Sequence, residues 1–165
     1  MKKYLLLFML LAFNANAQKP ELISQYGNWS SFYYNNGSQK VCFITSKPFL
    51  EEGKYTSRGD VSINITSRPQ EGSFDVFNIN GGYQYKHGSD VTLKIGTTTI
   101  TRIFTDKDKA WSFNSKTDKE IIDAFSRGTK ILVNAINSDD VETKDTYSLD
   151  GFNEAYKSMQ AKCGK

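Results

Sequence analysis

The sequence predicts a mostly β protein, a β-sandwich with two short flanking helices, and three observations support this fold class. Short runs in which apolar and polar residues alternate recur along the chain, as at residues 61–66 and 91–95. Turn-forming Asn and Gly residues separate such runs, as at residues 35–37. Only residues 117–128 and 148–163 change to the 3.6-residue period of a helix. Many short strands with regular turns, in a chain of this length, are typical of a β-sandwich.

The N-terminal segment, residues 1–17, has the three parts of a secretory signal peptide. Two lysines give it a positive start, residues 4–13 form an apolar run, and Ala15-Asn16-Ala17 is a small-residue cleavage site. The apolar run is too short to be a membrane anchor, because crossing a bilayer takes roughly 20 residues. We therefore predict cleavage after Ala17, export to the periplasm or the exterior, and one domain over residues 18–165.

The charge of the exported chain gives no support for a nucleic-acid partner. The whole chain carries 21 basic and 18 acidic residues. Without Lys2 and Lys3, which leave with the signal peptide, 19 basic residues face 18 acidic ones, a net charge of +1. Nucleic-acid binding needs a clustered positive face, which this balance does not indicate. No later run is long and apolar enough to span a membrane, so no integral membrane segment is expected after cleavage.

The individual strands follow from alternation and from the turns between them. Val61, Ile63 and Ile65 alternate with polar residues and should face the core. Residues 131–136 are apolar on both faces, which predicts a central strand that is covered on both sides. Strands are expected at residues 28–34, 40–46, 61–66, 74–79, 91–95, 98–104, 110–113, 131–136 and 141–147.

The first helix is predicted from a capping box at its start. Thr117 and Glu120 have the spacing at which the hydroxyl and the carboxylate each accept a hydrogen bond from a free backbone N–H. Residues 121–125 supply an apolar stripe, and Gly128 would end the helix.

The last helix carries one of the two cysteines on its inward-facing stripe. The stripe has helical spacing and consists of Phe152, Ala155, Tyr156, Met159 and Cys163. The other cysteine, Cys42, lies in the strand-like run at residues 40–46. Because an exported protein meets oxidising conditions and two cysteines allow one intramolecular pair, we predict a Cys42–Cys163 disulfide. Such a bond would fasten the terminal helix to the sheet.

The sequence assigns no catalytic, cofactor-binding or metal-binding residue. The single histidine, His87, lies in an expected loop without a nucleophile motif, and the chain has too few Cys and His residues for a structural zinc site. The close carboxylate pairs, Asp106/Asp108 and Asp139/Asp140, lie in stretches where Asp forms turns. We expect a non-enzymatic protein, with a glycan-acting hydrolase that uses a carboxylate pair as the alternative.

The tripeptide Arg58-Gly59-Asp60 is a sequence found in cell-adhesion ligands. Recognition would require the tripeptide to be exposed at a loop tip. It directly precedes the strand expected at residues 61–66, where Gly59 would serve as a turn glycine. A surface adhesin that uses this tripeptide is a further alternative.

Aromatic residues are abundant, at 13% of the chain, and they gather in two groups. Trp29 and Tyr33 lie in the first group, and Tyr83 and Tyr85 form the second. Alternate members of a strand point outwards, and exposed Tyr and Trp favour sugar stacking or protein contact. These four residues are the candidate ligand contacts, and cross-strand aromatic pairing on a sheet surface is the alternative interpretation.

The order of short landmarks along the chain resembles the invasion-associated locus B family of exported bacterial proteins. The landmarks are Gly27-Asn28-Trp29, Cys42-Phe43 with Ser46 and Pro48, residues 65–69, Gly82-Tyr83, Ala110-Trp111, residues 145–149, Gly151-Phe152, Ala155 and Cys163. The resemblance implies an immunoglobulin-like β-sandwich in the periplasm, or outside the cell, of an alphaproteobacterium. It implies no catalytic residue, and it links the chain to host-cell entry, in which some members of the family have a role. We therefore expect an exported accessory or binding protein whose partner is an unknown envelope or host protein.

Overall fold

The computed structural model describes residues 19–164, and the predicted signal peptide lies outside them. The described chain forms one antiparallel sheet of 11 strands, two α-helices and one short 3-10 helix, η1. The elements are β1 (Glu21–Tyr26), β2 (Trp29–Asn36), β3 (Gln39–Ser46), β4 (Leu50–Glu52), β5 (Ser62–Arg68), η1 (Pro69–Glu71), β6 (Ser73–Asn80), β7 (Asp90–Ile95), β8 (Thr98–Asp106), β9 (Lys109–Ser112), α1 (Ser115–Arg127), β10 (Lys130–Ile136), β11 (Glu142–Ser148) and α2 (Phe152–Cys163).

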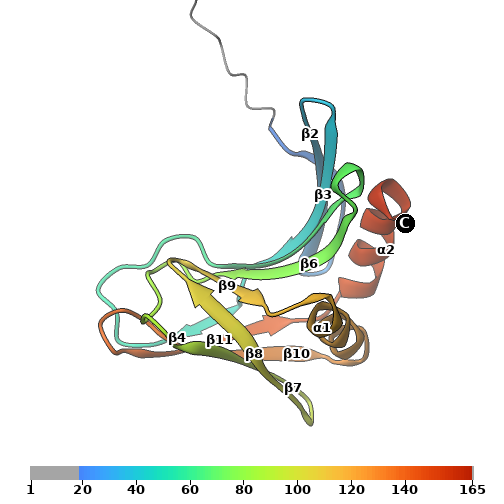
Figure 1. The fold of residues 1–165 in the computed structure, drawn as a ribbon. Coiled ribbons are helices and arrows are strands. Elements are labelled where there is room, and N and C mark those ends of the chain that lie inside the picture. Colours follow the sequence, from blue (N-terminus) through green and yellow to red (C-terminus); the bar gives the residue numbers. More distant parts are fainter. Residues whose placement is uncertain (1–18, 165) are drawn as a thin grey trace, which may run out of the picture.

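The sheet bends so that its two halves form two layers. The strand order is β1-β2-β3-β5-β6-β9-β8-β7-β10-β11-β4, and the short strand β9 joins the two halves. Figure 1 shows β2, β3 and β6 rising above the strands of the second half, with β9 between them. The predicted fold class, mostly β and sandwich-like with two short helices, is confirmed. The layers are halves of one continuous hydrogen-bonded sheet.

Turns and alternation predicted most of the strands. The turn after Asn36 joins β2 to β3, and the alternating Ile63 and Ile65 are fully buried. Strand β10 is central, as predicted, but the prediction that both its faces are covered is wrong, because Leu132 and Ile136 are only half-buried. The sequence did not predict β1 or β4. Both are edge strands, and neither shows burial that alternates from residue to residue.

The start of α1 differs from the predicted capping box. Asn114 is the N-cap, and its side-chain oxygen accepts a hydrogen bond from the backbone N–H of Thr117 at 3.0 Å. Thr117 lies in the first turn with its side chain buried. Asn caps a helix at least as well as Thr, and starting at Ser115 gives the helix additional residues. The predicted end at Gly128 is confirmed.

Four aromatic rings form the centre of the core where the two helices meet the sheet. Trp29 of β2 packs edge-on against Phe152 of α2, with ring centroids 5.0 Å apart. The Phe125 ring of α1 contacts both of them, and Phe77 of β6 lies 6.0 Å from Phe125. Each of the four side chains is at most 1% exposed. Neither helix in the described part of the chain is long and apolar enough to cross a membrane.

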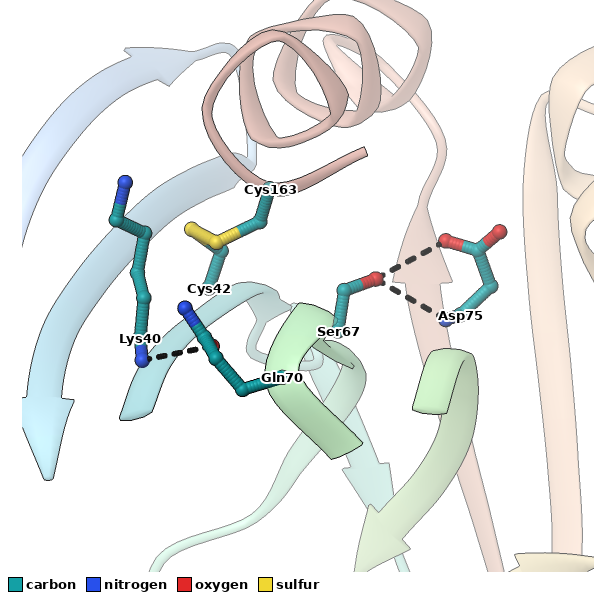
Figure 2. The surroundings of a disulfide bond; sticks show 6 residues. All are labelled: Lys40, Cys42, Ser67, Gln70, Asp75 and Cys163. Carbon is teal, nitrogen blue, oxygen red and sulfur yellow. Dashed lines mark hydrogen bonds between the residues drawn. A yellow bond between two sulfur atoms is a disulfide. The ribbon is translucent and has the colours of Figure 1, made fainter. Parts of the chain in front are cut away.

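The predicted disulfide between Cys42 and Cys163 is confirmed. Figure 2 shows the bond joining β3 to the last residue of α2, and the two Cα atoms lie 5.9 Å apart, an ordinary distance for a disulfide. Both cysteines are buried. Next to the bond, the backbone N–H of Lys40 donates to the Gln70 side chain at 3.0 Å. The disulfide therefore lies where β3, η1 and α2 meet.

Two glycines allow the β1–β2 turn to touch the start of α2. Gly27 and Gly151 both have positive φ, at 49° and 83°. A Cβ atom on Gly27 would lie 2.7 Å from the backbone oxygen of Asp150, and one on Gly151 would overlap the Tyr26 carbonyl. This close approach lets Asn28 N–H donate to the Asp150 carbonyl at 3.1 Å. Only glycine fits at either position.

One buried hydroxyl leads to a prediction about stability. Tyr147 of β11 is fully buried, and its hydroxyl has no hydrogen-bond partner in the described part of the chain. Because an unsatisfied buried hydroxyl is destabilising, Tyr147→Phe should raise the free energy of unfolding by about 1 kcal/mol in urea denaturation. Tyr147→Ala, which leaves a cavity, should instead lower it by about 3–5 kcal/mol. A Tyr147→Phe variant that is less stable than the wild type would contradict this interpretation.

Candidate binding surface

One face of the sheet, here called the outer face, is covered by neither α-helix of residues 19–164. On the opposite face, Ser31 of β2 hydrogen-bonds to Ser158 of α2, and Cys42 of β3 is bonded to α2. Since side chains alternate along a strand, Phe32 and Phe43 must point away from α2. Figure 1 shows both helices on one side of the first half of the sheet, with the other side bare. β3 and β6 curve along their length, and the bare side is the concave side of that curve (Figure 1).

Six outer-face residues lie side by side across six neighbouring strands. Their Cα atoms are successive partners in the strand pairing from β2 to β8. We call this set the central row: Ser30, Thr45, Asn64, Asn78, Trp111 and Phe104. Within it, the Asn64 amide donates to the Asn78 side-chain oxygen at 3.0 Å. The row therefore consists of hydroxyls and amides at one end and two aromatic rings at the other.

A second, more apolar row lies next to the central row on the same face. We call it the apolar row: Leu22, Phe32, Phe43, Thr66 and Val76. The rings of Phe32 and Phe43 are stacked, with centroids 5.2 Å apart and planes 17° apart. Leu22, at the edge of the sheet, is 55% exposed. The two rows together form a surface that is polar along one line and apolar along the next.

A hollow of about 550 Å³ lies at the β8 end of the central row. Two of its lining residues are exposed aromatics, with Phe104 at 43% and Phe113 at 71% exposure. Asp90, Thr101 and Asn114 supply polar groups to the same hollow. Apolar walls with a few polar side chains are the usual composition of a ligand site. This hollow and the two rows form the candidate binding surface.

Two of the four aromatic residues predicted as ligand contacts lie in the core, which corrects that prediction. Trp29 is fully buried, and its indole N–H donates to the backbone oxygen of Ser148 at 2.9 Å. Tyr85 is 6% exposed, and burial raises the pKa of its hydroxyl. Neither side chain presents a surface to a ligand. Trp29 packs against the aromatic rings of the two helices, whereas Tyr85 packs edge-on against Tyr83.

The other two predicted residues, Tyr33 and Tyr83, are half-buried and occupied by contacts within the chain. The Tyr33 hydroxyl donates to Glu21 at 2.6 Å, and Lys162 of α2 lies over its ring at 4.4 Å. Tyr83 hydrogen-bonds to Thr143, and Arg58 lies over its ring at 4.8 Å. Tyr33 is on the helix side of the sheet, and Tyr83 is outside both rows. The candidate binding surface does not include either residue.

The aromatics of the binding surface are ones that the sequence did not single out. Trp111 and Phe104 are cross-strand partners on β9 and β8, and Phe113 follows β9. The alternation of residues 110–113 indicates that Trp111 and Phe113 share a face. It does not indicate which face the helices cover, because that depends on tertiary packing. The exposed face could have been found only if the positions of α1 and α2 were known.

The tripeptide Arg58-Gly59-Asp60 is not presented as an adhesion ligand would be. Asp60 is exposed, with a side chain 85% accessible that pairs with Lys47 at 3.0 Å. The Arg58 side chain is only 4% accessible and forms two 2.6 Å hydrogen bonds to Asp145. Burial lowers the pKa of Arg58, but the hydrogen bonds and charge of Asp145 outweigh burial, so its pKa is raised. The exposed presentation that the adhesin alternative requires is therefore met at Asp60 but not at Arg58, whose guanidinium a receptor could not reach.

The carboxylate pairs named from the sequence lie in turns. Lys107, between Asp106 and Asp108, and Asp140 have positive φ, and Asp140 pairs with Lys86. His87 is exposed on a loop. Among residues 19–164, no group of three or more His, Cys, Asp or Glu side chains is placed to hold a metal ion.

A different pair of carboxylates lies near α1. Asp75 and Asp118 both line a hollow of about 430 Å³ between β6 and the helices. Burial raises the pKa of Asp118, although hydrogen bonds from the Ser112 hydroxyl and the Phe77 N–H partly offset it. These bonds fasten α1 to β6 and β9. Sequence spacing could not have paired the two residues, because they are 43 positions apart.

Comparisons with known proteins agree with the landmarks found along the chain. The family model described as invasion associated locus B (IalB) protein matches residues 29–160. A search of the curated proteins finds no match. Among solved structures, the crystal structure of invasion associated protein B from Bartonella henselae is similar, with a TM-score of 0.56 and 16% identity. The similarity covers 87% of this chain and 96% of that one, and at this identity it shows a shared fold. Because the family model covers most of the chain, the protein belongs to the invasion associated locus B family.

Proposed function

We propose that this protein is an exported, non-enzymatic binding protein of the bacterial envelope that holds its ligand on the outer face. The observation that carries the proposal is the bare face with aromatic side chains at one end, where Phe104 and Phe113 are exposed and Trp111 is half-buried beside them. Exposed aromatic rings on a rigid sheet supply large contact area at a small cost in conformational entropy. Large exposed apolar side chains that gather on one face mark an interaction site.

Export to an oxidising compartment is the second part of the proposal. The signal-peptide pattern at residues 1–17 and the Cys42–Cys163 disulfide both support it, because such bonds persist outside the cytosol. Fractionation of the native host, with thiols alkylated at lysis, should recover the protein in the periplasm or the medium with both cysteines unavailable to the alkylating reagent. Recovery in the cytosol with free thiols would contradict export. It would not decide whether the outer face binds a ligand, which the crosslinking experiment below tests.

The binding surface can be tested in living cells with a photoreactive side chain. A benzophenone-bearing phenylalanine analogue at position 113 should give covalent adducts on irradiation, because Phe113 lines the hollow of the outer face. The matched control is the same analogue at position 49, since Phe49 is 62% exposed but lies beside β4, away from both rows. Equal adduct yields at positions 113 and 49 would contradict a ligand on the outer face.

A role in host-cell invasion is supported by family alone. The family description and the name of the Bartonella henselae protein both contain the word invasion. A sequence identity of 16% supports a common fold, but it does not show that the two proteins share a partner or an activity. The proposed function therefore places the ligand in the envelope or on the host and does not depend on a role in invasion.

One observation favours a second candidate, a hydrolase acting on glycans. Glycoside hydrolysis uses two carboxyl groups, one of them with a raised pKa. Asp75 and Asp118 line the same hollow, and the pKa of Asp118 is raised. Measuring the release of reducing ends distinguishes the two candidate functions. A hydrolase would release new reducing ends from a bound glycan, and the Asp118→Asn variant would lose this activity. A binding protein would return the glycan unchanged.

A further inference from the structure

We propose that the ligand of the outer face is an uncharged oligosaccharide that lies along the central row, across the strands. The inference rests on the proposed function and deepens it by naming the chemical class of the ligand. It depends on three properties of the outer face: unpaired amide groups in the central row, a parallel apolar row and the absence of charge from these two rows.

The first property is a donor and an acceptor left unpaired at the middle of the row. The Asn64 amide nitrogen donates to Ser62 at 3.1 Å and to Asn78 at 3.0 Å, which uses both of its hydrogens. The Asn64 side-chain oxygen and the Asn78 side-chain nitrogen have no other partner among the described residues. Both are held in place by the amide–amide bond and remain available. A sugar hydroxyl, which donates and accepts at one atom, can bond to both groups.

The second property is the pairing of a polar row with an apolar row. A pyranose ring is amphipathic, with hydroxyl groups around its edge and C–H groups on its faces. The central row offers hydroxyls and amides to the edge, and the stacked Phe32 and Phe43 rings offer an apolar surface beside it. At the far end, Trp111 and Phe104 supply rings in the central row itself. The spacing of strands makes the central row about 24 Å long, enough for several linked sugars.

The third property is the absence of charge from both rows. Charged residues begin in the next row, where Lys109 of β9 is the partner of Asp106 of β8, and at the end of the central row, where Asp90 is the partner of Phe104. A phosphate-bearing or otherwise anionic polymer would find no cation in either row and would meet the Asp90 carboxylate. The charge pattern therefore favours a neutral chain over nucleic acid or acidic polysaccharide.

A protein partner fits the surface less well. Protein interfaces have an apolar centre with a polar rim, since water must be excluded from the middle. On the central row the order is different, because the amide pair of Asn64 and Asn78 occupies the middle and aromatic rings occupy one end. A desolvated, unpaired amide at the centre of a protein interface would be costly. The hydroxyl groups of a sugar can instead form hydrogen bonds to the unpaired amide oxygen of Asn64 and amide nitrogen of Asn78.

The test is a printed array of neutral glycans, followed by titration of the tightest binder into the labelled, disulfide-bonded protein. Cellohexaose and chitohexaose serve as soluble probes in parallel. The chain has two tryptophans, which provide an internal control. The indole N–H signal of Trp111 and the side-chain amide signals of Asn64 and Asn78 should shift. The Trp29 indole is buried and bonded to Ser148, so its signal should stay in place.

Variants complete the test. Phe104→Ala and Trp111→Ala should each weaken binding by about fivefold to tenfold, because each removes one stacking ring. Phe104 is 43% exposed, so its replacement leaves the fold intact, and the control variant Phe49→Ala should bind as the wild type does. Absence of binding to every neutral glycan on the array, or shifts confined to residues outside the two rows, would overturn the inference. If position 113 still gave adducts with a protein, the proposed binding function would stand without its oligosaccharide ligand.

Discussion

Replacing Cys163 with alanine should lower the free energy of unfolding by about 4–5 kcal/mol relative to the oxidised wild type. The bond joins residues 121 positions apart, so its loss frees most of the unfolded chain from one constraint. Total stabilities of domains are about 5–15 kcal/mol, which makes this a large fraction. Urea denaturation followed by circular dichroism, with and without a phosphine reductant, measures the effect.

Two controls separate the bond from the side chains that form it. Reduction of the wild type should cause nearly the same loss as Cys163→Ala, since both remove the bond. Cys42→Ala combined with Cys163→Ala should lose little more than either single variant, because one substitution already opens the loop. A single variant within about 1 kcal/mol of the oxidised wild type would show that α2 stays docked by packing alone.

Replacing Asp145 with alanine should cost about 3 kcal/mol, because the buried Arg58 charge would lose both of its 2.6 Å bonds and keep only the more exposed Glu51, at 3.2 Å, as an ionic partner. The guanidinium and the carboxylate are 4% and 3% exposed, so water cannot take the place of the lost oxygen atoms. Arg58 also donates to the backbone oxygen of Gly81 at 2.8 Å, which ties the loop before β5 to β6 and β11. The same denaturation experiment, at neutral pH, measures the loss.

The neighbouring ion pair gives a matched control for this prediction. Asp60→Ala removes the partner of Lys47, but both side chains are largely exposed, so the change should be below about 1 kcal/mol. Joint replacement of Arg58 by Met and Asp145 by Leu should recover much of the stability lost in Asp145→Ala, since neither charge remains buried. If Asp145→Ala were as mild as Asp60→Ala, the Arg58–Asp145 pair would not be the anchor of this loop.

The elements that the sequence predicted are those determined by local chemistry. Positive φ at Gly37 and Gly96 places the hairpin turns, and alternation at Ile63 and Ile65 identifies the buried side of β5. The disulfide could be predicted because an exported chain meets oxidising conditions and two cysteines permit only one intramolecular pair. Where local signals compete, the prediction was wrong, as at the start of α1, where Asn114 replaced Thr117 as the cap.

The binding surface could not be predicted because it depends on what covers each face. Trp29 and Trp111 both lie in short strands, and nothing in their neighbours tells a fully buried tryptophan from a half-buried one. Trp29 is buried because α1 and α2 pack on its side of the sheet. The central row brings together residues from position 30 to position 111, so only the strand order places Asn64 beside Asn78 and Trp111.

The contact between Gly27 and Gly151 limits how relatives with this fold can diverge. The outer face can change with the ligand, because neither α1 nor α2 packs against its side chains. At the two glycines, however, any side chain would push the β1–β2 turn away from the N-terminus of α2. We therefore expect both glycines to be retained even in relatives whose ligand-contacting residues have all been replaced. The pair would then fix the alignment of such sequences where overall identity is low.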